Sequence, residues 1–122
     1  MSAMLQVSAD RLQQLRSDAR LERDTILERR VRGGEDPAIA VEEAPEVDDF
    51  VVLALRDELL EDSGRLAEFG LARLAARAGG PEAEAHRRNA DRVEFELLRI
   101  IAAAVPELTV AVWRAGEHLT TE

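Results

Sequence analysis

The chain has 122 residues, a length that accommodates one domain rather than two. Its 25 acidic and 16 basic residues give a net charge of −9, which argues against non-specific binding to the phosphates of nucleic acid. Every basic residue is arginine and there is no cysteine, so disulfides, thiolate metal sites and cysteine nucleophiles are excluded.

No uncharged segment approaches the roughly 20 apolar residues that a membrane span needs. The first residues also lack the basic and then apolar pattern of a signal peptide. We therefore expect a cytoplasmic protein without a membrane partner. Twenty of the apolar residues are alanine, and this composition suits close-packed helices better than a thick sheet core.

The negative charge is concentrated in one stretch of the chain. Residues 1–34 carry a net charge of +2 and residues 63–122 a net charge of −1, whereas residues 35–62 carry eleven acids and one arginine. Such a stretch is typical of a solvated surface that aids solubility. Its functional alternative is a docking surface for a basic partner.

The first predicted element is an Arg-rich helix in the N-terminal segment, residues 1–34. Ser8 is a favourable N-cap, and the apolar residues Leu12, Ala19 and Ile26 recur at seven-residue steps. A stripe this narrow predicts contact with a single neighbouring helix. The arginines and acids that alternate over the rest of the helix favour a salt-bridged, exposed surface over a nucleic-acid site.

Residues 35–47 are predicted to form an acidic linker. Pro37 and Pro45 stand there among several acids, and this composition argues against a regular helix. Ile39 and Val41 alternate with small residues, a pattern that a short strand would also show.

The core of the domain is predicted to be a helical hairpin over residues 48–105. Two apolar stripes run along residues 48–78, which we expect to form one kinked central helix, with a division into two helices near Gly64 as the alternative. Gly79 and Pro81 predict a tight turn into a second, antiparallel helix. The seam of that helix alternates steps of three and four residues: Ala83, His86, Ala90, Val93, Leu97, Ile100 and Ala104.

The C-terminal tail, residues 106–122, contains the β-leaning segment 108–113. A strand there would need residues 38–42 or another subunit as its partner, and a short helix is the competing interpretation. The predicted fold class is therefore mainly all-α: a three-helix bundle built on a long antiparallel helical hairpin, with a short β-leaning C-terminal segment.

Two groups of carboxylates have a spacing that could serve a magnesium site. Glu58 and Glu61, beside Asp62, form one group, and Asp91 and Glu94 form the other. The register of the predicted hairpin offsets the groups by about seven residues, or ~10 Å along a helix. This offset is too large for one ion within one chain, so no metal and no cofactor is expected. A magnesium-dependent hydrolase with a carboxylate site between subunits is kept as an alternative.

The sequence offers no other catalytic motif. It has no Gly-rich phosphate loop and no Gly-x-Ser-x-Gly motif. His86 and His118 are the only histidines, which excludes a three-histidine zinc site within one chain. We therefore expect a protein that is not an enzyme.

The candidates for partner contact are apolar side chains outside the predicted seams and acids in or near the linker. Aromatic groups left off the seams favour an exposed partner surface. The aromatic candidates are Phe50, Phe69, Phe95 and Trp113, and the acidic candidates are Glu42, Glu43, Glu46 and Asp49; Leu98 also lies outside the seams but is not a contact candidate.

These features favour a small, non-catalytic helical module that binds another protein, with a second copy of itself (a homodimer) among the candidate partners. An adaptor, a regulator or an assembly factor would be built this way. A regulator of nucleic-acid transactions, acting through the Arg-rich helix or as an acidic mimic of DNA, is the remaining alternative.

Overall fold

The structure is a computed structural model, and it describes residues 5–117. Within that range there are six α-helices, one short 3-10 helix and no strand, which confirms the predicted all-α class. In chain order the elements are α1 (Ala9–Arg32), α2 (Pro37–Glu43), α3 (Val47–Asp62), α4 (Leu66–Ala78), α5 (Ala83–Ala104), η1 (Pro106–Leu108) and α6 (Thr109–Gly116).

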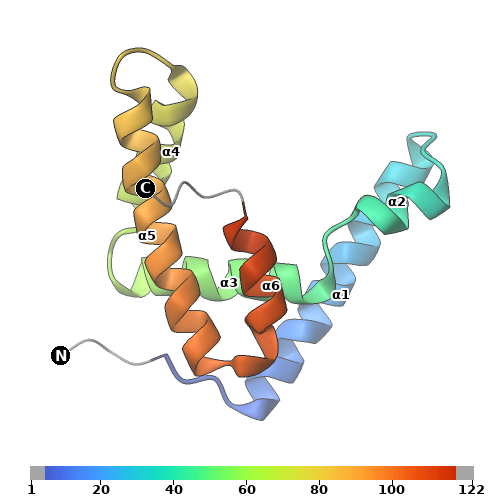
Figure 1. Cartoon of the computed structure of the whole chain (residues 1–122). Helices are drawn as coiled ribbons and strands as arrows, with labels where there is room; N and C mark the ends of the chain where they lie inside the picture. Colours follow the sequence, from blue (N-terminus) through green and yellow to red (C-terminus); the bar gives the residue numbers. More distant parts are fainter. Residues whose placement is uncertain (1–4, 118–122) are drawn as a thin grey trace.

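The central helix is α3, which lies across the middle of the molecule. It contacts α1 on one side and α5 and α6 on the other (Figure 1). The α4–α5 hairpin extends beyond one end of α3, while α2 covers the far end of α1, so that α1 and α2 form a separate arm (Figure 1). None of the described helices combines the length and the apolar character that a membrane span requires.

The N-terminal helix, α1, begins after the N-cap that the sequence predicts. The Ser8 hydroxyl accepts a hydrogen bond from the backbone N–H of Arg11, and the helix is capped at Gly33. Leu12 and Ala19 are the buried residues of this helix. A narrow stripe therefore contacts α3, while most of the helix surface faces water.

The expectation that residues 35–47 form no regular helix is wrong. The short helix α2 is capped by Asp36, whose carboxylate accepts a hydrogen bond of 2.8 Å from the backbone N–H of Ala38. Pro37 lies in the first turn of α2, where a missing N–H removes no helical hydrogen bond. The prolines therefore delimit this helix instead of preventing it.

The α1–α2 arm is held together by a small apolar contact and by an arginine. Ala40 of α2 is completely buried, and α2 contacts α1. Arg23 of α1 donates hydrogen bonds to the carbonyl oxygens of Pro45 (3.0 Å) and Val41 (3.2 Å). Its guanidinium thereby binds one carbonyl in the last turn of α2 and one in the connection that follows it.

The predicted single helix over residues 48–78 is wrong, and the alternative of two helices is what the structure shows. Gly64 adopts a φ of +72°, in the left-handed region that favours glycine. The backbone N–H of Gly64 donates to the carbonyl of Glu61, and that of Arg65 donates to Leu60, which closes α3. The chain then changes direction before α4 begins (Figure 1).

The turn predicted at Gly79 is confirmed. Gly79 and Gly80 have φ values of +79° and +95°, which glycine adopts without steric cost. The helices on either side, α4 and α5, pack against each other as a hairpin. Because the chain breaks at Gly64, this hairpin pairs α5 with α4 and not with the whole of residues 48–78.

The face of α5 that is buried in the structure is rotated relative to the seam predicted from the apolar residues. Ala90 and Leu97 are buried as expected, but Ile100 is exposed, and Asp91 and Glu94 are buried instead. A pattern of apolar residues cannot predict buried carboxylates. They are accommodated because each carboxylate has an arginine partner.

The segment 108–113, which is β-leaning in sequence, is helical. Leu108, Ala111 and Val112 are buried, and their spacing of three and four residues places them on one helical face toward the core. The strand partner offered by residues 38–42 is absent because those residues lie in α2. The competing interpretation, a short helix, is therefore correct.

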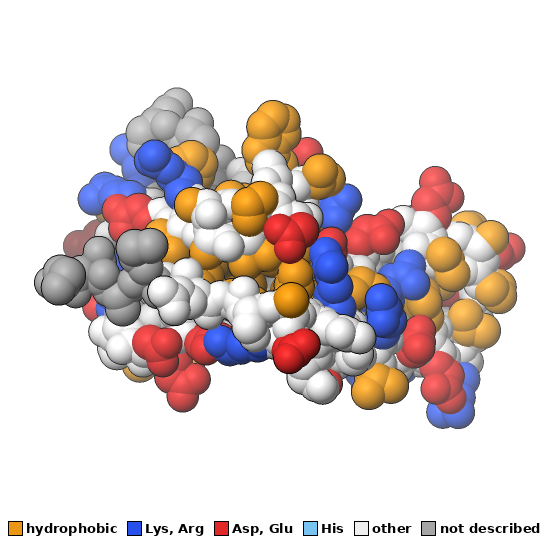
Figure 2. Space-filling view, turned by 90° about the horizontal axis from the view of Figure 1, so that it is seen from below, with side chains coloured by type: hydrophobic (Ala, Val, Ile, Leu, Met, Phe, Trp, Pro, Cys, Tyr) orange, Lys and Arg blue, Asp and Glu red, His pale blue; other side chains and the backbone are white. Residues whose placement is uncertain are grey.

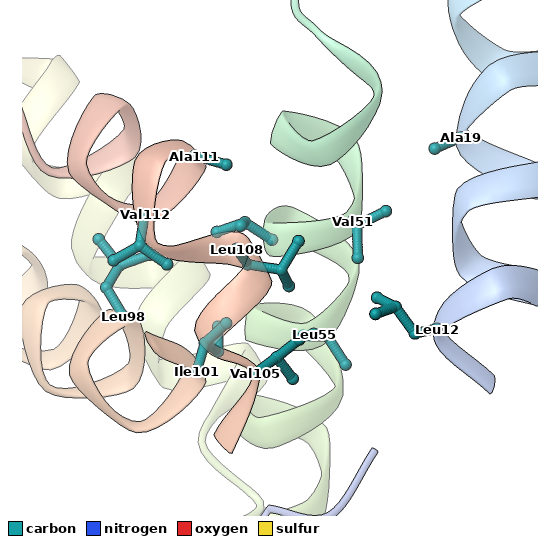
Figure 3. Close-up of a cluster of buried hydrophobic side chains, with 11 residues drawn as sticks. Leu12, Ala19, Val51, Leu55, Leu98, Ile101, Val105, Leu108, Ala111 and Val112 are labelled. Atoms are coloured by element: carbon teal, nitrogen blue, oxygen red, sulfur yellow. The ribbon is translucent and has the colours of Figure 1, made fainter. Parts of the chain in front are cut away.

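The main core lies between α1, α3, α5 and the C-terminal elements (Figure 3). Val51 and Leu55 project from α3, Leu12 reaches them from α1, and Ile101 reaches them from α5 (Figure 3). The remaining buried members are Ala19, Val52, Leu98, Val105, Leu108, Ala111 and Val112. A smaller cluster in the α4–α5 region consists of Leu60, Phe69, Ala90 and Leu97.

We expect Leu55→Ala to lower the free energy of unfolding by about 2–5 kcal/mol, because it removes a completely buried side chain and leaves a cavity. Leu53→Ala, on the same helix but at a position that is 39% exposed, is the matched control and is expected to change it by less than about 1 kcal/mol. Urea unfolding followed by circular dichroism measures both. Equal losses in the two variants would contradict the core described here.

Candidate functional site

Two features stand out beyond the helix packing: a buried network of charges and an exposed apolar groove. In the charge network Arg73 of α4 donates to Asp91 over 2.9 Å and also to Glu94. Arg56 of α3 donates to the other oxygen of Glu94 over 2.7 Å. Both carboxylates belong to α5, so the network joins α3, α4 and α5.

An aromatic ring completes the charge network. The guanidinium carbons of Arg73 and Arg56 lie 5.1 and 5.6 Å from the centre of the Phe69 ring. A guanidinium at this distance from an aromatic centroid gains cation–π attraction. Phe69 is only 9% exposed, so the expectation that its ring is an exposed contact group is wrong. The two arginines cover it.

The network is balanced in charge and satisfied in hydrogen bonds. Burial acts to lower the pKa of Arg56, but the hydrogen bonds that it donates to Glu94 and Asp57 outweigh burial, so its pKa lies above the ordinary value. Within residues 5–117 no buried side-chain nitrogen or oxygen lacks a hydrogen-bond partner. The network therefore joins α3, α4 and α5 through charges that are all paired.

The carboxylates weighed as magnesium ligands lie in three different settings. Asp91 and Glu94 are engaged by arginines, and Glu58 pairs with Arg11 of α1. Glu61 and Asp62 are exposed near the end of α3. Residues 5–117 contain no group of three or more His, Asp or Glu side chains placed to hold a metal ion.

The second feature is an apolar groove between α5 and α6, with a volume of about 350 Å³. We call it the α5–α6 groove. Its α5 side consists of Phe95, Leu98, Arg99 and Ala102, and its α6 side consists of Val112, Trp113, Gly116 and Glu117. Two of the lining residues carry charge, one on each side, and the rest offer carbon surface.

Small residues shape the α5–α6 groove. A Cβ atom added at Gly116 would lie 3.9 Å from Leu98 Cδ1, so α6 approaches α5 closely at this point. Ala102 likewise adds only a methyl group to the lining. Larger side chains at these two positions would fill the hollow that the apolar residues around them enclose.

The groove brings together two of the predicted contact residues. Trp113 is 75% exposed and Phe95 is 43% exposed, and both line the hollow. Phe50, by contrast, is half-buried against the main core, and Leu98 is buried as part of that core. Leu98, which the predicted seams leave out, is thus a core residue. Its side chain forms part of the wall shared by the core and the groove.

The predicted acidic contact residues are partly neutralised by the protein's own arginines. Asp49 accepts a hydrogen bond of 2.9 Å from Arg114 of α6, and Glu43 pairs with Arg30 of α1 at 3.5 Å. The other two acidic candidates, Glu42 and Glu46, are exposed. The acidic stretch thus serves in part to attach neighbouring helices.

Several arginines of α1 are engaged in the same way. Arg16 bonds to Asp48 at the start of α3 over 3.0 Å, and this bond raises the pKa of Arg16. Arg32 pairs with Glu28 one turn earlier on α1. Basic, acidic and apolar side chains are interspersed over the α1–α2 arm, at the right of Figure 2. This mixture differs from the continuous basic surface that nucleic acid requires.

His86 belongs to neither feature. His86 lies 3.8 Å from Glu82 one turn earlier on the exposed part of the hairpin. His118 lies outside the described residues.

No protein-family model, no curated protein and no solved structure matches this chain.

We expect Glu94→Gln to lower the free energy of unfolding by about 2 kcal/mol or more, because it leaves two largely buried guanidinium groups with one carboxylate fewer. The same change at exposed Glu96, on the next position but one of α5, is the matched control and is expected to have an effect below about 0.5 kcal/mol. Chemical unfolding measures the difference. Equal free energies of unfolding for the two variants would show that the network contributes no stability.

Proposed function

We propose that this chain is a non-catalytic protein–protein interaction module and that the α5–α6 groove is its docking surface. The observation that carries the proposal is the exposure of Trp113 and Phe95 beside one apolar hollow. The cytoplasmic location expected from the sequence belongs to the same proposal. Adaptors, regulators and assembly factors are the classes of protein that act in this way.

Exposed aromatic side chains around a hollow are typical of docking surfaces. Tryptophan is among the residues that contribute most to protein–protein binding energy, because a large apolar area is removed from water when it is covered. Single exposed apolar residues are common on any protein, but an exposed tryptophan and phenylalanine that line one groove form a contiguous patch. Val110, exposed three positions before Trp113 on α6, extends this patch.

A small-molecule site fits the groove less well. Pockets for small ligands combine an apolar lining with several convergent polar groups that fix the orientation of the ligand. Here the lining offers the charged side chains Arg99 and Glu117, one from each side of the groove, while the other lining residues are apolar. Charge on either side of an apolar strip is instead the usual arrangement of a protein interface.

We expect a partner protein to bind the wild-type chain and to be lost from the double variant Phe95→Ala with Trp113→Ala. The reason is that the variant removes both exposed aromatic groups of the groove while the core stays intact. The measurement is affinity capture from a lysate of the source cells with the purified chain immobilised, followed by identification of the bound proteins.

The matched control is Leu71→Ala with Leu74→Ala. These residues are 66% and 61% exposed on α4, away from the groove, so the control removes similarly exposed apolar surface. It should capture the same partner as the wild type. If all three baits capture the same proteins in the same amounts, the groove is not the docking surface and the proposal fails.

A further inference from the structure

The two charged residues of the α5–α6 groove have opposite signs and stand on opposite sides of the groove. Arg99 belongs to α5, and Glu117 follows the end of α6. Neither forms an ion pair within residues 5–117. A surface with one unpaired charge of each sign can be complementary to itself, because a two-fold axis that passes midway between the two groups places each positive group of one copy against the negative group of the other.

The apolar part of the groove is also complementary to itself. Trp113 stands beside the hollow and is 75% exposed, so one surface carries both a projecting aromatic group and a cavity of about 350 Å³. In an interface with two-fold symmetry, each contact occurs twice, with the roles of the two copies exchanged. Insertion of each Trp113 into the opposite groove therefore covers both projecting rings and fills both hollows.

The distribution of charge permits this approach in spite of the net charge of −9 per chain. Most of the acidic excess lies in residues 35–62, which form α2 and α3. The contact of α3 with α5 and α6 is made through their buried faces, not through the groove. Residues 95–117, which form the groove, carry three acids and two arginines, a net charge of −1. Glu117 also borders a second hollow lined by Glu43, Asp49, Asp91 and Glu94, and each of these acids pairs with an arginine of the same chain. Two copies that meet through the groove thus bring little unpaired like charge together.

We propose that the occupant of the α5–α6 groove is a second copy of this chain, in a two-fold symmetric homodimer. Trp113 of each copy enters the groove of the other, and Arg99 of each copy pairs with the partner's Glu117. This inference rests on the proposed function, since it names the partner of the same surface. A foreign protein and the chain's own residues 118–122 are the other occupants that the experiment distinguishes.

The first measurement is the molar mass in solution over a concentration series, by light scattering and sedimentation. We expect a dimer that dissociates on dilution. Trp113 is the only tryptophan and the chain has no tyrosine, so the fluorescence of this single side chain reports whether it is covered. Its emission should shift to shorter wavelength as the dimer forms. Trp113→Ala should raise the dimer dissociation constant by at least about thirtyfold, the effect of a central interface residue.

Charge reversal tests the identity of the partner. Arg99→Glu alone and Glu117→Arg alone each place two pairs of like charges across the symmetric interface, so each should weaken the dimer by at least about tenfold. An equimolar mixture of the two variants should again form a dimer, because every contact in the mixed pair joins opposite charges. A foreign partner with its own sequence would not produce this rescue.

Folding is checked independently of association. Both charge-reversal variants change exposed side chains, and their circular dichroism and thermal unfolding at high dilution should match the wild type. Leu71→Ala, at an exposed position on α4, is the control for loss of apolar surface and should leave the dimer unchanged. A dimer that forms equally well in Trp113→Ala and in both charge-reversal variants uses another surface, and this result would overturn the inference.

The remaining outcomes separate this inference from the proposed function. A chain that stays monomeric at all concentrations, with Trp113 emission typical of a water-exposed indole, overturns the homodimer but leaves the groove open to a foreign protein, which the capture experiment then detects. A monomer whose Trp113 emission lies at short wavelength and moves to long wavelength when residues 118–122 are deleted has its groove covered by its own chain. That result overturns both proposals.

Discussion

The orientation of α5 is set by two charges that the protein buries. A carboxylate removed from water without a partner would destabilise the fold by several kcal/mol, so Asp91 and Glu94 must face donors. Arg56 of α3 and Arg73 of α4 are those donors. Since the two arginines come from different helices, α5 must turn one particular face toward both. Phe95, next to Glu94 in sequence, is then turned toward the open side of the helix.

The groove follows from this orientation together with the position of α6. The core residues Ala111 and Val112 hold α6 against α3 and α5, and Gly116 lies beside Leu98. The exposed edge of α5 and the exposed edge of α6 then lie beside each other. The charge network thereby determines which side chains of α5 lie on the surface beside α6.

The sequence predicts the elements that depend on local chemistry. Ser8 as an N-cap and Gly79 as a turn residue depend on their own backbone neighbours, and both are found as predicted. The burial of Asp91 and Glu94 could not be predicted from the spacing of apolar residues, because their partners come from two other helices. Of the site, Trp113 and Phe95 could be named as exposed groups, but the groove that joins them depends on packing between helices.

For some of the wrong predictions, the sequence does contain a local signal of the correct structure. Asp36 before Pro37 is a helix start, since aspartate caps a helix and proline suits the first turn. Leu108, Ala111 and Val112 have the spacing of a helical face, and this period outweighs the β preference of the individual residues. Gly64 sets the end of α3 because it can adopt a positive φ, although the apolar stripe continues across it.

The two apolar clusters differ in how far apart along the chain their members lie, and this difference has a consequence for the order of folding. The cluster of the α4–α5 hairpin joins neighbouring helices, whereas the main core must bring Leu12 of α1 to Val112 of α6. Contacts between segments close in sequence form sooner, because less chain entropy is lost when the loop between them closes. During synthesis α1 leaves the ribosome well before α3, and α6 leaves after every other helix. The groove that α6 completes is therefore the last surface of the described fold to appear.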